Sequence, residues 1–125
     1  MKVVKFLWAA IALLCCMACD STHNLGLPHK VEFDRAGGSK DCYSTSRFYA
    51  MHICDYNGNG DNIFNNMRDS MIIVTCDWLT AKTPRYSMGK VELIAAPNPT
   101  KKKRVLYVYC SAAGNDEATI KVVQY

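Results

Sequence analysis

Residues 55–62, DYNGNGDN, carry oxygen-bearing side chains at a spacing that could bind calcium. An EF-hand loop needs oxygen ligands at its positions 1, 3 and 5, a glycine at position 6 and a bidentate carboxylate at position 12. The stretch meets these requirements up to the glycine, but position 12 falls on Asn66, which is neutral. Asn-Gly dipeptides also favour turns, because both residues tolerate positive φ. The stretch therefore predicts a turn between two strands, with a weak calcium site as the alternative.

Four of the seven cysteines lie in the body of the chain: Cys42, Cys54, Cys76 and Cys110. Cysteines exported from the cytoplasm can form disulfides, and four of them allow three pairings. Cys76 and Cys110 fall on the apolar faces of expected core strands, which favours a bridge between sheets there, with Cys42 and Cys54 closing a local loop. Four buried free thiols are the alternative. The spacings fit poorly with a structural zinc site.

Groupings suited to catalysis are sparse. His52 is the only histidine after residue 30, and its neighbours Met51 and Ile53 are apolar. No serine lies in a G-x-S-x-G elbow, no carboxylate pair stands out for glycoside hydrolysis, and no phosphate-binding loop occurs. The sequence predicts a protein that is not an enzyme and that needs neither cofactor nor metal.

The first residues read as a secretory signal. Lys2 and Lys5 precede the apolar run 6–14, which is too short to cross a bilayer as a helix because a spanning helix takes about 20 residues. A basic start followed by a short apolar run is typical of a signal peptide, which is removed from the mature protein.

The end of this segment, CMAC at 16–19, resembles the lipobox of bacterial lipoproteins. The resemblance implies cleavage before Cys19 and lipidation of its sulfur. We therefore expect a signal peptide at 1–18, a polar tether at 19–29 and a folded domain at 30–125. The acyl chains would anchor the protein to the bacterial outer membrane, on its periplasmic or cell-surface side.

The charge balance of the remaining chain is nearly neutral. Removal of Lys2 and Lys5 lowers the formal net charge from +4 to +2. Nucleic acid binding needs a concentrated basic footprint, so we expect no nucleic acid partner. The only charge run, 101–104, lies between two expected strands, where it predicts a solvated loop.

Apolar residues alternate with period two over short segments, which is the pattern of half-buried strands. Gly, Asn and Pro separate these segments, and no window shows a helical stripe with caps. The pattern predicts an all-β, antiparallel sandwich. The expected strands lie at 31–33, 42–54 (one long strand or two short ones), 71–78, 91–95, 104–111 and 118–124.

Several marks along residues 31–124 match a known family: Phe33 followed by Gly37-Gly38, Trp78-Leu79-Thr80, Gly89, Asn98-x-Thr100 leading to Arg104, and Ile120-x-Val122-x-Gln124. With them the chain resembles the BACON domain (Bacteroidetes-associated carbohydrate-binding, often N-terminal). The stretch 48–70 departs from the family and looks like an insertion. A second tryptophan often seen in the family is missing, and the four cysteines are unusual.

The resemblance implies an immunoglobulin-like β-sandwich of about seven strands, carried by a cell-envelope lipoprotein that binds glycan weakly. Glycan binding asks for exposed aromatic rings near amides or carboxylates. Trp78 continues an apolar face, so we expect it in the core. The candidate glycan-binding residues are Tyr56, Asn57, Asn59, Asp61 and Tyr86.

The alternative function is a protein-interaction or structural subunit of an outer-membrane assembly. Such a subunit would contact its partner through a sheet edge or through the face that carries Tyr107 and Tyr109. These two tyrosines alternate with the apolar residues of their strand, so they share the face opposite the core.

Overall fold

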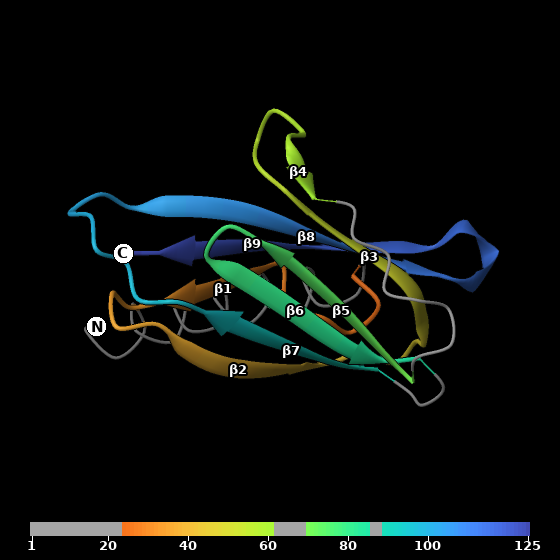
Figure 1. Ribbon diagram of the computed structural model, residues 1–125. Helices are drawn as coiled ribbons and strands as arrows, with labels where there is room; N and C mark the ends of the chain where they lie inside the picture. Colours follow the sequence, from red (N-terminus) through yellow and green to blue (C-terminus); the bar gives the residue numbers. More distant parts are fainter. Residues whose placement is uncertain (1–23, 62–69, 86–88) are drawn as a thin grey trace, which may run out of the picture.

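Strands dominate the part of the chain that the computed structural model describes, residues 24–61, 70–85 and 89–125 (Figure 1). Eight strands have four or more residues, and the strand β4 has only two. The strands are β1 (Lys30–Phe33), β2 (Gly38–Tyr43), β3 (Phe48–Cys54), β4 (Gly60–Asp61), β5 (Met71–Cys76), β6 (Leu79–Pro84), β7 (Lys90–Ala95), β8 (Arg104–Ala112) and β9 (Glu117–Gln124).

Two sheets face each other across the core. One has the order β1-β9-β8-β3-β4 and the other β2-β7-β6-β5. Neighbouring strands are antiparallel, except that β1 runs parallel to β9. The orders β9-β8-β3 and β2-β7-β6 reproduce the G-F-C and B-E-D orders of immunoglobulin domains. The expected antiparallel, immunoglobulin-like sandwich is therefore confirmed.

Helical structure is confined, within these residues, to the 3-10 turn η1 (Ala113–Asn115) between β8 and β9. None of the described segments forms a helix with the length and apolar character needed to cross a membrane.

Alternation along each strand builds the core. Leu106, Val108 and Cys110 of β8 are buried, whereas the residues between them are half-buried on the opposite face. Successive side chains of a strand point to opposite faces, so each strand contributes every second residue to the core. The largest fully buried apolar side chains are Phe48, Leu27, Ile53, Leu79, Leu93, Ile120, Val74, Val91, Val108 and Val122.

The stretch 48–70 is not a simple insertion, because its first seven residues form β3. This strand lies between β8 and β4, and its residues Phe48, Met51 and Ile53 belong to the core. The expected insertion was therefore wrong for 48–54, because three large apolar residues of this segment are buried in the core. Residues 62–69 lie outside the described part of the chain.

Strand β6 was missing from the sequence expectation. Leu79, Ala81 and Thr83 face the core with Thr80 and Lys82 between them, so the period of two is present. The signal was weak because alanine and threonine supply part of the apolar face. The preceding strand also ends earlier than expected: β5 stops at Cys76, and Asp77 turns the chain with a φ of 53°.

Residues 24–29, expected as part of a flexible tether, are packed against the sandwich. Leu27 is completely buried. The side-chain amide of Asn24 donates to the Thr119 carbonyl at 2.9 Å, and its oxygen accepts the Thr119 N–H at 2.9 Å. The tether expectation is therefore wrong from Asn24 onward, because one apolar residue and one amide find partners on distant elements. Residues 19–23 lie outside the described part.

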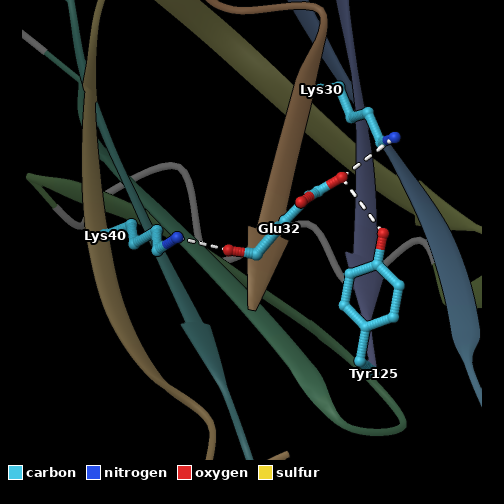
Figure 2. Close-up of polar contacts among 4 residues, drawn as sticks. All are labelled: Lys30, Glu32, Lys40 and Tyr125. Atoms are coloured by element: carbon cyan, nitrogen blue, oxygen red, sulfur yellow. Dashed lines mark hydrogen bonds and ion pairs between the residues drawn. The ribbon is translucent and has the colours of Figure 1, made fainter. Parts of the chain in front are cut away.

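A polar cluster joins β1 to β2 and to the end of the chain (Figure 2). The Glu32 carboxylate pairs with Lys30 at 3.0 Å and accepts a hydrogen bond from the Tyr125 hydroxyl at 3.1 Å, while Lys40 donates to the Glu32 carbonyl. The Lys30 contact, with that of Tyr125, lowers the pKa of Glu32. The cluster is exposed, so we interpret it as an edge contact that contributes little to stability.

Candidate binding site at one end of the sandwich

A cleft of about 350 Å³ opens where the β2–β3 loop, the end of β6 and the β8–β9 turn meet. Clefts with a few convergent polar groups are the usual places for small-ligand binding. The residues that line the cleft are Ser46, Arg47, Phe48, Tyr49, Arg85, Ala112 and Ala113.

The local backbone at the start of β3 presents an aromatic ring to the cleft. Phe48 is anchored in the core, whereas Tyr49 leaves 57% of its surface exposed. The pairing of β3 with β8 shifts register between Phe48 and Ala50, so the bulged residue is Tyr49. A bulge re-aims a side chain at a sheet end.

The loop that carries Arg47 is held in place by hydrogen bonds. The Ser44 hydroxyl donates to the Leu25 carbonyl at 2.5 Å and accepts the Ser46 N–H at 3.0 Å. Gly89 packs against this loop so closely that a Cβ there would lie 2.2 Å from the Ser44 carbonyl oxygen. The loop is therefore pre-organised, which reduces the entropy lost on binding.

Two guanidinium groups give the cleft a positive character. Arg47 is exposed and Arg85 is half-buried, and both line the cleft. The backbone of Arg85 is fixed where its N–H donates to the Ser70 carbonyl at 2.8 Å. Guanidinium groups form paired hydrogen bonds to carboxylate and sulfate-like groups.

Sequence reasoning missed Arg47 and Tyr49 and named only the neighbour of Arg85, Tyr86. The available signal was the aromatic pair Phe48-Tyr49 directly after Arg47. The sequence does not say which of the two rings is exposed, because that depends on the bulge in β3. Tyr86 lies outside the described residues.

The stretch 55–59 forms the predicted turn between β3 and β4. One carboxylate oxygen of Asp55 accepts the backbone N–H groups of Asn57 and Asn59, each at 2.9 Å. The Asp55 N–H donates to the Asn59 carbonyl at 2.9 Å and closes the turn. One oxygen of the carboxylate that would begin a calcium loop thus stabilises the turn.

Tyr56 at this turn is 86% exposed, and Asn57 and Asn59 are exposed beside it. The side chain of Asp61 is outside the described part. The turn follows the end of β3, whereas the cleft lies at its beginning, six residues away or roughly 20 Å. The candidates Tyr56, Asn57 and Asn59 therefore do not share a site with Arg85.

The four body cysteines are free thiols in the structure. Cys76 pairs with Leu79, and Leu79 with Ala95, so Cys76 lies at the end of the sandwich where β8 begins. Ala96 there accepts a hydrogen bond from Arg104, the first residue of β8. Cys110 lies six residues beyond Arg104, roughly 20 Å along β8, so the register places the two cysteines toward different ends of the sandwich, and cysteines whose Cα atoms are more than about 7 Å apart cannot be bridged.

The pairing of Cys42 with Cys54 is equally unsuited to the fold. Cys42 points into the core, whereas Cys54 pairs with Tyr107 and hydrogen-bonds through its thiol to the Tyr109 side chain on the opposite face of the sheet. Both pairings favoured by the sequence therefore conflict with the register of the strands.

Tyr109 also stacks on His52, with 6.1 Å between ring centroids and 27° between ring planes. Nδ1 of His52 is buried and has no hydrogen-bond partner among the described residues. Burial raises the pKa of Cys54, which keeps the thiol protonated, the opposite of an activated nucleophile.

Asn98, Thr100, Arg104 and Gln124, which carry part of the family resemblance, gather at the end of the sandwich opposite the cleft, whereas Gly89 lies at the cleft end. The buried Asn98 donates to the Lys102 carbonyl at 2.9 Å and accepts the Thr100 hydroxyl at 2.7 Å. Arg104 donates through Nε to the side-chain oxygen of the buried Gln124 at 2.8 Å. These contacts stabilise the β7–β8 loop, so the motif has a structural role here.

Trp78 belongs to the same region. It is 6% exposed and lies in the core, as expected from the sequence. The neighbouring lysines 101–103 are exposed in the β7–β8 loop, in agreement with the predicted solvated loop.

Comparison with known proteins returned no match, either among family models or among curated proteins.

Proposed function

We propose that this chain is a non-enzymatic binding domain of the bacterial cell envelope, anchored to the outer membrane by lipid at Cys19, and that its cleft binds a glycan carrying carboxylate or sulfate groups. The anchor is supported by the lipobox-like sequence at 16–19. The class of ligand is supported by the resemblance to the BACON domain and by the side chains at the cleft.

The observation that carries the ligand proposal is the grouping of Tyr49 with Arg47 and Arg85 around one concavity. An exposed tyrosine ring offers a flat apolar face for a sugar ring, together with a hydroxyl that can hydrogen-bond. The exposed Arg47 guanidinium group supplies donors for an acidic substituent. A neutral sugar would use only the first of these features.

The turn at 55–59 is a weaker candidate. Tyr56 stands alone there, and the Asp55 carboxylate is already engaged with the turn backbone. The amides of Asn57 and Asn59 remain as potential contacts, but no cleft gathers them.

A binding assay with immobilised neutral and acidic glycans tests the ligand proposal. We expect binding to uronic acid or sulfated glycans that weakens with salt, because exposed charge pairs are screened. Tyr49→Ala should weaken binding about two- to tenfold, since an aromatic contact is worth roughly 0.5–1.5 kcal/mol. Arg47→Ala should weaken it about tenfold or more, as hydrogen bonds to charged groups contribute roughly 1.5–3 kcal/mol.

Tyr56→Ala and Tyr43→Ala are matched controls, because both tyrosines are more exposed than Tyr49 and neither lines the cleft. Both controls should bind as the unchanged protein does. Loss of binding in Tyr56→Ala, with Tyr49→Ala unaffected, would move the site to the turn and overturn the cleft proposal.

The anchor has its own test. Growth of expressing bacteria with radiolabelled palmitate should label the chain, and Cys19→Ala should abolish both the label and recovery in the membrane fraction. Labelling that persists in Cys19→Ala would overturn the assignment of Cys19.

The second candidate function is a protein-interaction or structural subunit of an outer-membrane assembly. It is favoured by β5, which forms one edge of its sheet and leaves Met71 36% exposed. Within the described residues no strand pairs with the outer side of β5, and such an edge can add a strand from another protein. Capture of one stoichiometric envelope protein, with no glycan bound on the array, would favour this function.

A further inference from the structure

We propose that Cys42 of β2 and Cys110 of β8 form a disulfide that joins the two sheets of the mature protein. The inference rests on the export of the chain put forward above, because structural disulfides form and persist in oxidising compartments.

The topology places both cysteines near the same end of the sandwich. Cys42 is one residue from the end of β2, and the short loop 44–47 then crosses to the other sheet and starts β3 at Phe48. Phe48 pairs with Ala112, only two residues beyond Cys110. Cys42 and Cys110 therefore lie on opposite sheets, and each is near the end of the sandwich that carries the cleft.

Both side chains point into the same core. Cys42 is 6% exposed, Cys110 is completely buried, and the two belong to one apolar cluster. The strand β2 occupies the place of strand B of an immunoglobulin domain, and β8 the place of strand F. In antibody domains a disulfide joins the two sheets between these strands, so the space between them can hold one. The Cys76 thiol also contributes to raising the pKa of Cys54, but Cys54 lies on the face of its sheet opposite the core, where it hydrogen-bonds to the Tyr109 side chain.

The electrostatics agree with the geometry. Burial raises the pKa of Cys110 to about 12, and the Cys42 thiol also contributes to raising it. Burial also raises the pKa of Cys42. Because thiol–disulfide exchange requires a thiolate, both thiols react slowly once the core has closed. The bond therefore forms during folding.

The exchange partner can be any small disulfide or disulfide-bonded oxidoreductase, and oxidised glutathione serves as the reagent. The Cys42 thiolate attacks one glutathione sulfur, forms a mixed disulfide and releases one glutathione thiolate. The Cys110 thiolate then attacks the Cys42 sulfur and releases the second. The two cysteines lose two protons and two electrons, and the glutathione disulfide is reduced to two thiols.

The arrangement of tryptic sites makes the test direct, because each body cysteine falls on a separate peptide: Cys42 on 41–47, Cys54 on 48–68, Cys76 on 69–82 and Cys110 on 105–121. The full chain is prepared in two ways: by export from a bacterial host, and by refolding of the reduced, unfolded protein with reduced and oxidised glutathione. Free thiols are alkylated before digestion without reductant.

We expect the linked pair 41–47 with 105–121 from both preparations, and its loss in Cys42→Ser and in Cys110→Ser. The double variant Cys54→Ser with Cys76→Ser should retain it. Reduction should lower the urea midpoint of the unchanged chain and leave that of Cys42→Ser unaltered. The search for the linked peptides in the unchanged chain gives a result even if the serine variants fail to fold.

Alkylation of both Cys42 and Cys110 in the two preparations would overturn the inference, and so would a link from either of them to 48–68 or 69–82. The linked pair in the refolded chain alone would support the bridge and count against export. Because glycan binding plays no part in this readout, a failure of the ligand proposal would not affect the test of the disulfide.

Discussion

The guanidinium carbon of Arg104 lies 4.8 Å from the centroid of the Trp78 ring. The same guanidinium group donates to the Gln124 side chain and to the carbonyls of Ala96 and Pro97. One cation therefore links the β5–β6 turn, the end of β7 and the last residues of β9. Stacking on an aromatic face and forked donation together are properties of arginine that lysine lacks.

Arg104→Ala should lower the free energy of unfolding by about 2–4 kcal/mol, because it removes the stacking and leaves the oxygen of the buried Gln124 amide without its donor. Arg104→Lys should recover less than half of this loss. Urea unfolding of the three proteins measures both effects. Lys103→Ala, an exposed neighbour, should change stability by less than about 0.5 kcal/mol, and equal losses in the two alanine variants would contradict the assignment.

Thr83→Val should raise stability by about 1 kcal/mol. Thr83 is completely buried, and its hydroxyl has no hydrogen-bond partner among the described residues. Replacement of an unsatisfied hydroxyl by a methyl group of similar shape removes a desolvation penalty. Thr80→Val is the matched control, because the Thr80 hydroxyl shares a 3.0 Å hydrogen bond with Thr75. A thermal unfolding midpoint that falls in Thr83→Val would refute the prediction.

Leu27→Ala should lower the free energy of unfolding by about 2–5 kcal/mol, the cost of a cavity at a completely buried leucine. A residue in a free tether would show almost no effect. Chemical denaturation of the two proteins distinguishes the cases, and a change below about 0.5 kcal/mol would restore the tether interpretation.

The reduced chain should lose stability at alkaline pH. Burial raises the pKa of Cys110 from 9.0 to about 12 in the folded protein. Below pH 9 both folded and unfolded chains keep the proton, so the stability is fully present. Above pH 9 only the unfolded thiol ionises, and stability falls by about 1.4 kcal/mol per pH unit until the folded pKa is reached.

Urea unfolding in reductant between pH 8 and pH 10 measures this slope. Cys110→Ala starts from a lower stability but should show a shallower decline, because its side chain cannot titrate. Parallel declines in the two proteins would assign the pH dependence to other groups.

Much of the fold could be predicted from the sequence because its signals are local. Alternation of apolar residues identified the strands around Val31, Val74, Leu93, Val108 and Ile120. Asn and Gly placed the turn after β3, where Asp55 caps it. These patterns reflect side-chain direction and backbone preference within a few residues, so no distant partner is needed to interpret them.

The candidate site and the cysteine relationships depended on the tertiary structure. Arg47 and Arg85 are far apart in sequence and line the same cleft only because β3 begins and β6 ends at the same end of the sandwich. Cys42 and Cys110 likewise converge through the crossing of the 44–47 loop from one sheet to the other.

By itself, the sequence determined the class of the fold, most of its strands and the turn at Asp55. The burial of Leu27, the central place of β3 and the position of each cysteine were decided by contacts between sheets. The physical reason is that periodicity states which face of a strand is apolar, whereas the identity of the surface that covers this face depends on strand order and register.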